Sequence, residues 1–330
     1  MALDVKVTID MAKTVGVLGF GYPLILVENA TKAVDYTVCS DITAVVTAGF
    51  DDKTDAYNAA QLMFMQNHKP AKIAVCATTG TAVAWLAESK NISKEWRQLV
   101  VVNEGETAST VGAIAAAVEA ATVEKMYFAS IDHTTAEAVT GVEGCDRTVL
   151  FFYTATEDIP VPSAALAGEL GGLTAGSYTV NNMMLTGLTP LELSKAEIEA
   201  IHALKGITYV LSAGDGVCSE GIVASGEFID NVDNNDYIKQ QLEYKTQKVL
   251  NNNMKVPYTN VGIAMLEAAA LSVMKDAQNK GIVETFTVNY ALREETSVED
   301  RAARKYFGGN VKYEMQGAIH EVEIVAEASV

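Results

Sequence analysis

The sequence predicts a mixed α/β protein (α+β overall): a largely parallel α/β N-terminal domain, a C-terminal α+β domain, and an extended β-strand arm at each terminus. Three observations lead to this fold class. Short segments that are apolar on both faces alternate with helix-like segments between residues 54 and 153, as in parallel sheets covered by helices. Two long helix-like segments follow in the second half. Strict alternation of apolar and polar residues marks both ends of the chain.

The composition describes a globular, acidic chain. Its 330 residues are 49% hydrophobic and 20% charged, enough apolar material for two compact domains or one domain with a large insertion. The 42 acidic and 24 basic residues give a net charge of −18, which argues against nucleic acid and anionic membranes as partners. Residues 1–10 lack the features of a secretory signal, and no apolar run is long enough to cross a bilayer. We therefore expect synthesis in the cytosol and no membrane insertion.

The first strand is expected at the N-terminus itself. Every second residue is apolar and the residues between are polar; the apolar positions are Leu3, Val5, Val7, Ile9 and Met11. This period of two predicts a half-buried strand. A segment with glycines at positions 16, 19 and 21 follows, and residues 22–28 predict a second, apolar strand.

The middle of the chain predicts alternating helices and strands. Helices are expected over residues 54–67, 81–90, 107–122 and 134–140. Strands are expected over residues 72–77, 99–103, 126–131 and 148–153. Because these strands are apolar on both faces and helices separate them, they predict a largely parallel sheet.

The second half begins with a glycine- and threonine-rich segment, residues 161–190, which predicts a short helix followed by an irregular crossing. Ser194 with Glu197 three residues later is a capping-box pattern, so a helix is expected to begin there. The remaining expected elements are strands at 207–213, 222–230 and 282–290, and helices at 235–252, 260–280 and 297–307.

The C-terminal tail alternates like the N-terminus. After Gly317 the alternation shifts by one residue, and a shift beside a glycine predicts a bulge. The apolar positions are Val311, Tyr313, Met315, Val322 and Ile324. The expected division of the chain is an N-terminal arm over 1–20, an α/β domain over 21–200, a C-terminal assembly domain over 201–310 and a C-terminal arm over 311–330.

Motifs for nucleotide binding and covalent catalysis are missing. The glycines at 16, 19 and 21 have the reverse of the dinucleotide-binding spacing, and neither a phosphate-binding loop with its lysine nor a serine-nucleophile motif occurs. The four cysteines are far apart with apolar neighbours and are expected to be reduced core thiols: Cys39, Cys76, Cys145 and Cys218. We therefore expect no catalytic residues, no cofactor and no metal site.

Asp132 and His133 follow an expected strand, at a place where an α/β enzyme carries catalytic groups. We favour the use of this pair in a loop or cap. A cytosolic enzyme with a doubly wound α/β core and a site at this sheet edge is the alternative from another class.

A basic segment stands out in the acidic chain. Residues 297–307, SVEDRAARKYF, hold Arg301, Arg304 and Lys305 at spacings that place them on one helix face. One interpretation is an ordinary solvated helix with Glu299 and Asp300 stabilising its N-terminus. The other is an electrostatic docking face for an acidic partner surface.

The terminal strands expose unpaired backbone groups along their edges. Either both fold back onto the chain's own sheet, or they add to the sheets of neighbouring copies by β-augmentation. The second possibility predicts a self-assembling structural protein joined through residues 3–11 and 311–325.

Three segments carry a resemblance to a known family. They are SAALAGELGGLTAGSYTVNNMMLTGLTP over 163–190, SGEFIDNVDNNDYIKQQLEYKTQKVL over 225–250 and KVPYTNVGIAMLEAAALSVMKDAQNKGIV over 255–283, with the short sequence GITY over 206–209 between the first two. In this order they resemble the contractile-tail sheath proteins of myophages, R-type bacteriocins and other phage-tail-like particles.

The resemblance implies a non-enzymatic subunit that forms stacked rings around a tail tube. Its terminal arms would exchange strands between copies, and contraction would drive the tube through a target cell envelope. The helix before the C-terminal arm, with Arg301, Arg304 and Lys305, would contact the tube. The implied partners are further copies, the tail tube protein, and the baseplate and tail terminator proteins. Assembly would occur in the bacterial cytoplasm, followed by a place in a virion tail or a released extracellular particle. The alternative within the same class of particles is another tail component, such as a tube subunit.

Overall fold

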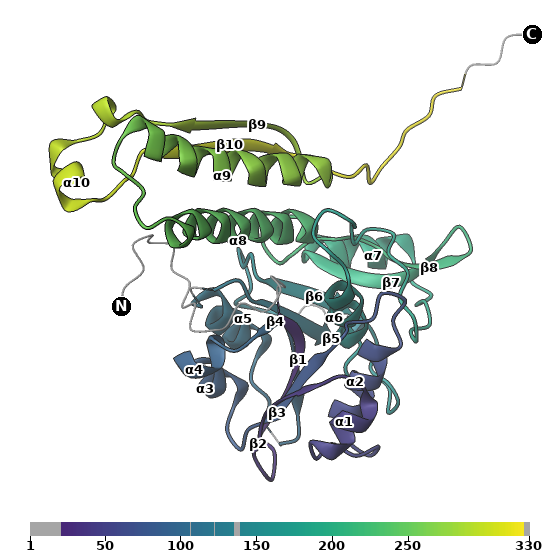
Figure 1. Cartoon of the computed structure of the whole chain (residues 1–330). Helices are drawn as coiled ribbons and strands as arrows, with labels where there is room; N and C mark the ends of the chain where they lie inside the picture. Colours follow the sequence, from purple (N-terminus) through teal and green to yellow (C-terminus); the bar gives the residue numbers. More distant parts are fainter. Residues whose placement is uncertain (1–20, 106, 122, 135–138, 327–330) are drawn as a thin grey trace, which may run out of the picture. The chain divides into compact units, whose positions relative to one another are not determined.

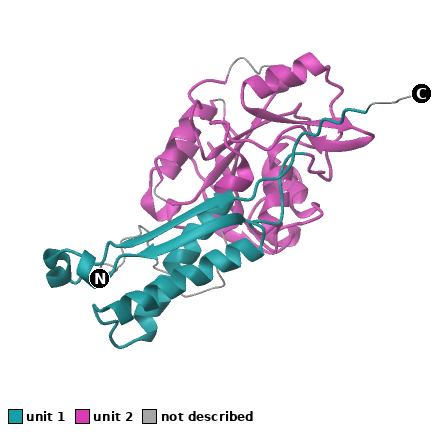
Figure 2. Ribbon diagram, turned by 90° about the horizontal axis from the view of Figure 1, so that it is seen from above, with its two compact units in different colours: residues 1–7, 175–181, 233–330 teal, residues 8–174, 182–232 magenta. Residues whose placement is uncertain are grey.

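A computed structural model describes residues 21–105, 107–121, 123–134 and 139–326 (Figure 1). The described chain divides into two compact units (Figure 2). The body unit holds residues 21–174 and 182–232, and the C-terminal unit holds residues 175–181 and 233–326. The strand expected at the N-terminus, with Leu3, Val5, Val7 and Ile9, lies outside the described residues.

The body unit is built on an eight-stranded sheet. In sheet order its strands are β2 (Val34–Cys39), β3 (Ile73–Ala77), β1 (Tyr22–Glu28), β4 (Trp96–Asn103), β5 (Met126–Ile131), β6 (Thr148–Phe152), β7 (Gly206–Ser212) and β8 (Asp215–Cys218). The inner strands are parallel, while β2 and β8 run antiparallel at the two edges. The largely parallel α/β sheet that the sequence predicts is confirmed.

Helices of the body unit connect these strands, and they are α1 (Ile42–Thr47), α2 (Asp55–Phe64), α3 (Ala82–Leu86), α4 (Ser89–Ile92), α5 (Val111–Glu119), α6 (Ser163–Gly172) and α7 (Lys195–Ala203). Thr54, Thr81 and Thr110 cap α2, α3 and α5, each accepting a hydrogen bond from the backbone N–H three residues later. Ser194 and Glu197 form both hydrogen bonds of a capping box at the start of α7, as the sequence predicts.

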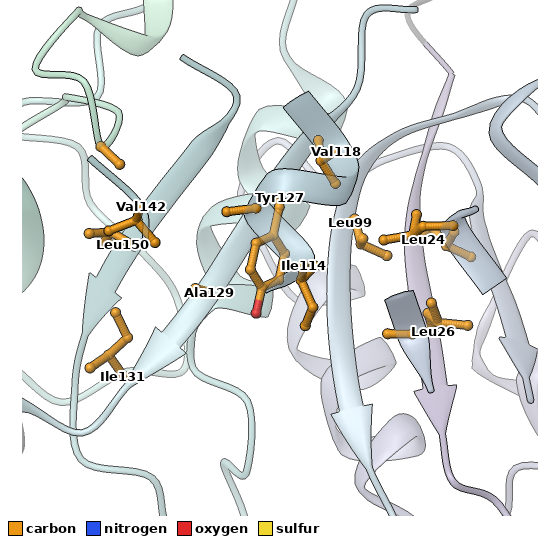
Figure 3. Close-up of a cluster of buried hydrophobic side chains, with 14 of the residues drawn as sticks. Leu24, Leu26, Leu99, Ile114, Val118, Tyr127, Ala129, Ile131, Val142 and Leu150 are labelled. Atoms are coloured by element: carbon orange, nitrogen blue, oxygen red, sulfur yellow. The ribbon is translucent and has the colours of Figure 1, made fainter. Parts of the chain in front are cut away.

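One face of the sheet is covered by α3 and α5. Ile114 and Val118 of α5 pack with Leu99 and Tyr127 of the sheet in one buried cluster (Figure 3). Burying an aliphatic side chain of this size stabilises a fold by about 1.5–3 kcal/mol. The body unit therefore completes a hydrophobic core from its own residues.

The other covering layer contains α2 and α6, and it depends on glycine. A Cβ on Gly168 would stand 2.6 Å from the Cα of Met63 in α2, and one on Gly172 would stand 1.7 Å from the carbonyl oxygen of His68. Residues 163–170 of α6 are all buried. The GELGG sequence at the end of α6 thus permits a contact that any side chain would prevent.

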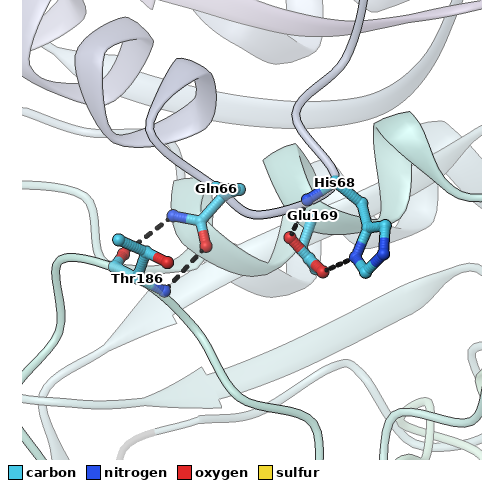
Figure 4. A network of polar contacts seen from close by, with 4 residues as sticks. All are labelled: Gln66, His68, Glu169 and Thr186. Atoms are coloured by element: carbon cyan, nitrogen blue, oxygen red, sulfur yellow. Dashed lines mark hydrogen bonds and ion pairs between the residues drawn. The ribbon is translucent and has the colours of Figure 1, made fainter.

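Buried polar groups fix the loop that follows α2 (Figure 4). The carboxylate of Glu169 accepts a hydrogen bond from the backbone N–H of His68 at 3.0 Å, and its other oxygen lies 2.5 Å from His68 Nδ1. Gln66 Nε2 donates to the carbonyl oxygen of Thr186 at 2.8 Å, and the Thr186 N–H donates to Gln66 Oε1 at 2.9 Å. These bonds join α6 and the irregular crossing to one loop.

The C-terminal unit contains two long helices and a separate two-stranded sheet. Its elements are α8 (Ile229–Asn252), which begins in the body unit, α9 (Asn260–Asn279), β9 (Val283–Tyr290), the 3-10 helix η2 (Arg293–Glu295), α10 (Val298–Ala303) and β10 (Gly309–Met315). Lys245 Nζ of α8 lies 2.5 Å from Asp276 Oδ2 of α9. Along its length α9 packs against β9 (Figure 1).

Several expected elements differ from the structure. The helix expected over 81–90 is divided into α3 and α4. Residues 222–230 do not form a strand, because the chain turns tightly at Gly226 (φ 93°), Ile222 and Phe228 form an isolated bridge, and α8 begins at Ile229. The helix expected over 297–307 ends at Ala303, since Arg304 takes a left-handed conformation with φ 57°.

The division into units also differs from the expected boundary at residue 200. β7 and β8 extend the eight-stranded sheet, so they belong to the body unit. The strand β2, the strand β8 and the helix α1 have no counterpart among the expected elements. The helix expected over 134–140 lies partly outside the described residues.

Candidate assembly surface

The two-stranded sheet of β9 and β10 has one apolar and one polar face. Antiparallel pairing places Val288 opposite Val311 and Phe286 opposite Tyr313 on one face. These side chains are half-buried, whereas the alternating residues Thr285, Thr287, Asn289, Asn310, Lys312 and Glu314 are exposed on the other face. Burial, together with the carboxylate of Glu267 in α9, raises the pKa of Tyr290. The apolar face of the sheet therefore lies on the α9 side.

The predicted arm residues Val311, Tyr313 and Met315 all lie in β10, where they pair with β9 of the same chain. One edge of β10 is therefore used in a sheet within the same chain. The register shifts between Glu314 and Met315, two residues before the expected bulge at Gly317. Within the described residues the sheet has only these two strands, so β9 and β10 each keep an outer edge without a strand beside it.

The tail after β10 forms no regular structure as far as residue 326. The predicted arm residues Val322 and Ile324 are 74% and 83% exposed. His320 Nε2 lies 3.0 Å from the hydroxyl oxygen of Thr179 in the same unit. The alternating tail sequence therefore has its apolar side chains in solvent in this single chain.

The basic residues singled out by the sequence are not on one helix face. Arg301 lies in α10, and its Nη1 donates hydrogen bonds to the carbonyl oxygens of Arg293, at 2.9 Å, and of Thr296. Arg304 and Lys305 follow the helix and are exposed. The structure thus assigns Arg301 to holding the η2–α10 turn and leaves two cations at the surface.

An aromatic cluster supports this turn, and the sequence interpretation missed it. Tyr306 stacks on Tyr290 at a centroid distance of 5.9 Å and meets Tyr258 edge-on at 6.0 Å. The Tyr258 hydroxyl donates to the carbonyl oxygen of Lys305 at 3.0 Å. Burial and the two neighbouring tyrosines raise the pKa of Tyr306 to about 12. In the sequence, the only sign of this cluster was that its three tyrosines lie near the ends of expected helices and strands.

Large apolar side chains are exposed around the same turn. Val298 and Phe307 are 66% and 73% exposed, and Val261 and Leu292 are exposed as well. Neighbouring exposed apolar side chains of this size are typical of a surface that a partner covers. The η2–α10 turn, residues 291–308, therefore combines apolar and basic groups in one segment.

The Asp132–His133 pair has the geometry of a turn. Asp132 Oδ1 accepts hydrogen bonds from the Thr134 N–H at 2.9 Å and hydroxyl at 2.7 Å, and these bonds lower the pKa of Asp132. His133 Nδ1 lies 3.9 Å from Asp132 Oδ1 and 2.9 Å from the Thr154 hydroxyl. Asp132 therefore caps the local loop, in agreement with the interpretation that the sequence favoured.

The remaining chemical groups give no metal or thiol site in the described chain. Cys39, Cys76 and Cys218 are buried and Cys145 is half-buried, and all four are free thiols. Burial raises the pKa of Cys76 to about 12, which keeps it protonated. Within the residues that the structure describes, no cluster of His, Cys, Asp and Glu suited to a metal ion occurs. None of the described helices combines the length and apolarity of a membrane span.

Comparisons with known proteins give a result at the level of structure alone. No protein-family model and no curated protein sequence matches the chain. A chain of the anti-feeding prophage (AFP) baseplate matches with a TM-score of 0.72 and 13% identity, covering 99% of this chain and 98% of its own. The contracted AFP helical sheath gives 0.71 and 14% over the same shares. The contracted sheath complex of the extracellular contractile injection system PVC gives 0.72 and 9%, over 100% and 98%. This chain therefore has the fold of the sheath proteins of contractile injection systems.

Proposed function

We propose that the chain is a structural subunit of a contractile tail sheath, polymerising as stacked rings around a tail tube. The observation that carries this proposal is the likeness in fold to two contracted sheaths, which covers 99% or more of this chain and 98% of each of those two chains. Both units are included, so the likeness is not limited to the common α/β sheet. The subunit acts mechanically and not as an enzyme.

Strand exchange through the terminal arms is the joining device in this proposal. A sheet of two strands is marginal by itself and gains stability from further strands. The outer edges of β9 and β10 offer backbone groups for that pairing, and the tail bearing Val322 and Ile324 has the alternation of a strand. Residues 3–11 have the same alternation. At about 0.5–1.5 kcal/mol per hydrogen bond, a strand of six pairs contributes several kcal/mol.

Docking on the tube is assigned to the η2–α10 turn. Arg304 and Lys305 supply exposed positive charge, and Arg301 keeps the turn in shape through its bonds to the backbone. The exposed side chains of Val298 and Phe307 add apolar contact area. An acidic, partly apolar tube surface fits this segment. The baseplate and tail terminator proteins would meet the two ends of the sheath.

Contraction releases energy stored at assembly in this proposal, as the copies move to a wider and shorter lattice while the arms keep them attached. The assembly forms in the bacterial cytoplasm and then acts in a virion tail or a released extracellular particle.

Electron microscopy of the purified full-length chain tests the proposal. Hollow, ridged cylinders of stacked rings are expected at high concentration or on added tubes. A chain that stays monomeric under both conditions would contradict a sheath function. Smooth, narrow tubes would instead identify a tube subunit, and nucleotide or coenzyme binding in a thermal-shift screen would favour an enzyme.

A further inference from the structure

Glu28 is a buried carboxylate in the body unit for which the sheath function supplies no role. It ends β1, whose other residues, YPLILV, are uncharged, and it is 1% exposed. Two oxygens accept three hydrogen bonds, from the Ala82 N–H at 2.7 Å, the Ser109 N–H at 2.7 Å and the Ser109 hydroxyl at 2.5 Å. Burying a carboxylate is unfavourable unless such bonds replace its hydration.

Glu28 lies where the order of strands in the body sheet reverses. From β1 the chain first builds toward β3 and β2, and it then crosses to place β4 on the opposite side of β1. The order of strands therefore reverses between β1 and β4. In open parallel sheets, ligands bind at such a switch point, in the crevice beyond the carboxyl ends of the strands. The Glu28 carboxylate lies at this carboxyl end.

The three donors come from two different connections. Ala82 is the first residue of α3, in the segment after β3, whereas Ser109 lies in the segment between β4 and α5. A single carboxylate thus joins two crossover connections that the sequence separates by 27 residues, from 82 to 109. Two N–H groups and one hydroxyl converging on two oxygens are also the kind of donor set that holds carboxylate or phosphate ligands.

Neighbouring side chains form further hydrogen bonds at the ends of β1 and β4. Asn29 Nδ2 donates to Asn103 Oδ1 at 2.8 Å and to the carbonyl oxygen of Thr107 at 2.9 Å. Asn103 Nδ2 in turn donates to the carbonyl oxygen of Gly105 at 2.7 Å. A Cβ on Gly105 would stand 2.5 Å from the Cβ of Asn29, so this loop is pressed against the end of β1.

We propose that the switch point of the body sheet is an anion-binding position and that the Glu28 carboxylate is its built-in occupant. The chain supplies from its own sequence the negative charge that a ligand supplies in other sheets of this topology. The α3 and α5 connections are then locked without any small molecule. This inference depends on the body unit alone and stands or falls independently of the sheath function.

Chemical rescue tests the proposal. Glu28→Ala removes a group the size of acetate and leaves the three donors without their acceptor. We expect the melting temperature of the full-length variant to fall by about 10 °C. Sodium acetate is expected to restore a large part of this loss. Sodium chloride at equal ionic strength and neutral acetamide at equal concentration are expected to restore much less, because the site selects a carboxylate.

Two controls sharpen the measurement. One control is the wild-type chain, and the other is Glu197→Ala, which removes an exposed capping carboxylate. For each of them, the melting temperature in acetate should equal that in chloride at the same ionic strength. Equal rescue of Glu28→Ala by acetate, acetamide and chloride would overturn the proposal. Should Glu28→Ala not fold, Glu28→Gln keeps the shape and removes the charge. A melting temperature of Glu28→Gln equal to that of the wild type would also overturn it, and a clear loss would support it.

Discussion

The sheet of the body unit and the sheet of the C-terminal unit differ in how completely they bury their strands. In the body unit, the inner strands β1, β3 and β6 bury their apolar side chains almost completely. In the C-terminal unit, the strands β9 and β10 are at best half-buried along most of their length, and apolar residues of the tail and of the η2–α10 turn are exposed. The sheet of the body unit thus has its apolar strands covered, whereas the two-stranded sheet of the C-terminal unit keeps one exposed face and the tail beyond it keeps exposed apolar side chains.

The largest expected effect on folding separates two phenylalanines. Phe152 in β6 is fully buried and Phe307 is 73% exposed. Phe152→Ala is expected to lower the free energy of unfolding by about 3–5 kcal/mol, because it leaves a cavity in the core. The matched change Phe307→Ala is expected to alter it by less than about 0.5 kcal/mol. Denaturant unfolding of the full-length variants measures both, and similar losses would remove the contrast between the units.

A second test concerns the glycines of α6. Gly172→Ala forces a Cβ into the carbonyl oxygen of His68 and is expected to destabilise the chain by about 2–3 kcal/mol. Gly80→Ala is the control, since its Cβ would meet only the Thr78 hydroxyl at 3.9 Å. Thermal unfolding of the two variants compares them. A wild-type melting temperature for Gly172→Ala would mean that α6 shifts freely over the loop.

A smaller effect is expected at the capping box of α7. Ser194→Ala removes the acceptor for the Glu197 N–H and is expected to lower stability by about 1 kcal/mol. Ser297→Ala is the corresponding change at α10, where the Ser297 hydroxyl accepts from the Asp300 N–H at 3.0 Å. Because α10 is short and exposed, Ser297→Ala should leave the global unfolding transition unchanged even if α10 unfolds. Equal effects at both caps would show that the units unfold as one.

Removal of the C-terminal tail is expected to have the smallest effect on stability and a large effect on assembly. Ending the chain after residue 317 removes the exposed tail and is expected to leave the melting temperature within a few degrees of the wild-type value. Sheath cylinders should no longer form in electron micrographs. Intact cylinders from the truncated chain would show that the tail is not a connector.

The basic residues allow a matched test of docking. Reversing the charge of Arg304 and Lys305 should leave folding unchanged, since both are exposed, and should stop assembly on tubes. Reversal of Lys312, which is exposed on the polar face of β10, serves as the control. Unchanged assembly of the double variant on tubes would mean that the turn is only a solvated surface.

Several sequence signals translated directly into structure. Runs that were apolar on both faces became the parallel strands β3, β4, β5 and β6, because such a pattern is stable only with helices on both sides of a sheet. The Ser194–Glu197 pattern became a capping box, since it depends on neighbouring residues alone. The edge strand β2 was missed, because an edge strand buries little and has no strong apolar pattern.

Contacts between distant residues decided the rest. The end of α10 at Ala303 follows from the Tyr306 ring, which stacks on Tyr290 and whose hydroxyl donates to the Ala291 carbonyl oxygen at 2.8 Å. The chain must reverse to make this contact, whatever the helix propensity of RAARKYF. The carboxylate of Glu28 showed its role only once Ala82 and Ser109 were beside it. An acidic residue at the end of an apolar strand was the one available sign.

The sequence by itself determined the α/β class, the parallel sheet, the capping box of α7 and the alternation of the C-terminal arm, because each depends on residues close together in the chain. The tertiary structure alone decided that β10 pairs with β9, that Arg301 holds a turn, and that Glu28 closes the switch point. The β10–β9 pairs join residues 19 to 32 positions apart, and the Glu28 contacts join residues 54 and 81 positions apart, so loop closure and topology, and not local preference, select them. The contacts of Arg301 span only 5 and 8 residues, but they form only where the chain turns between η2 and α10.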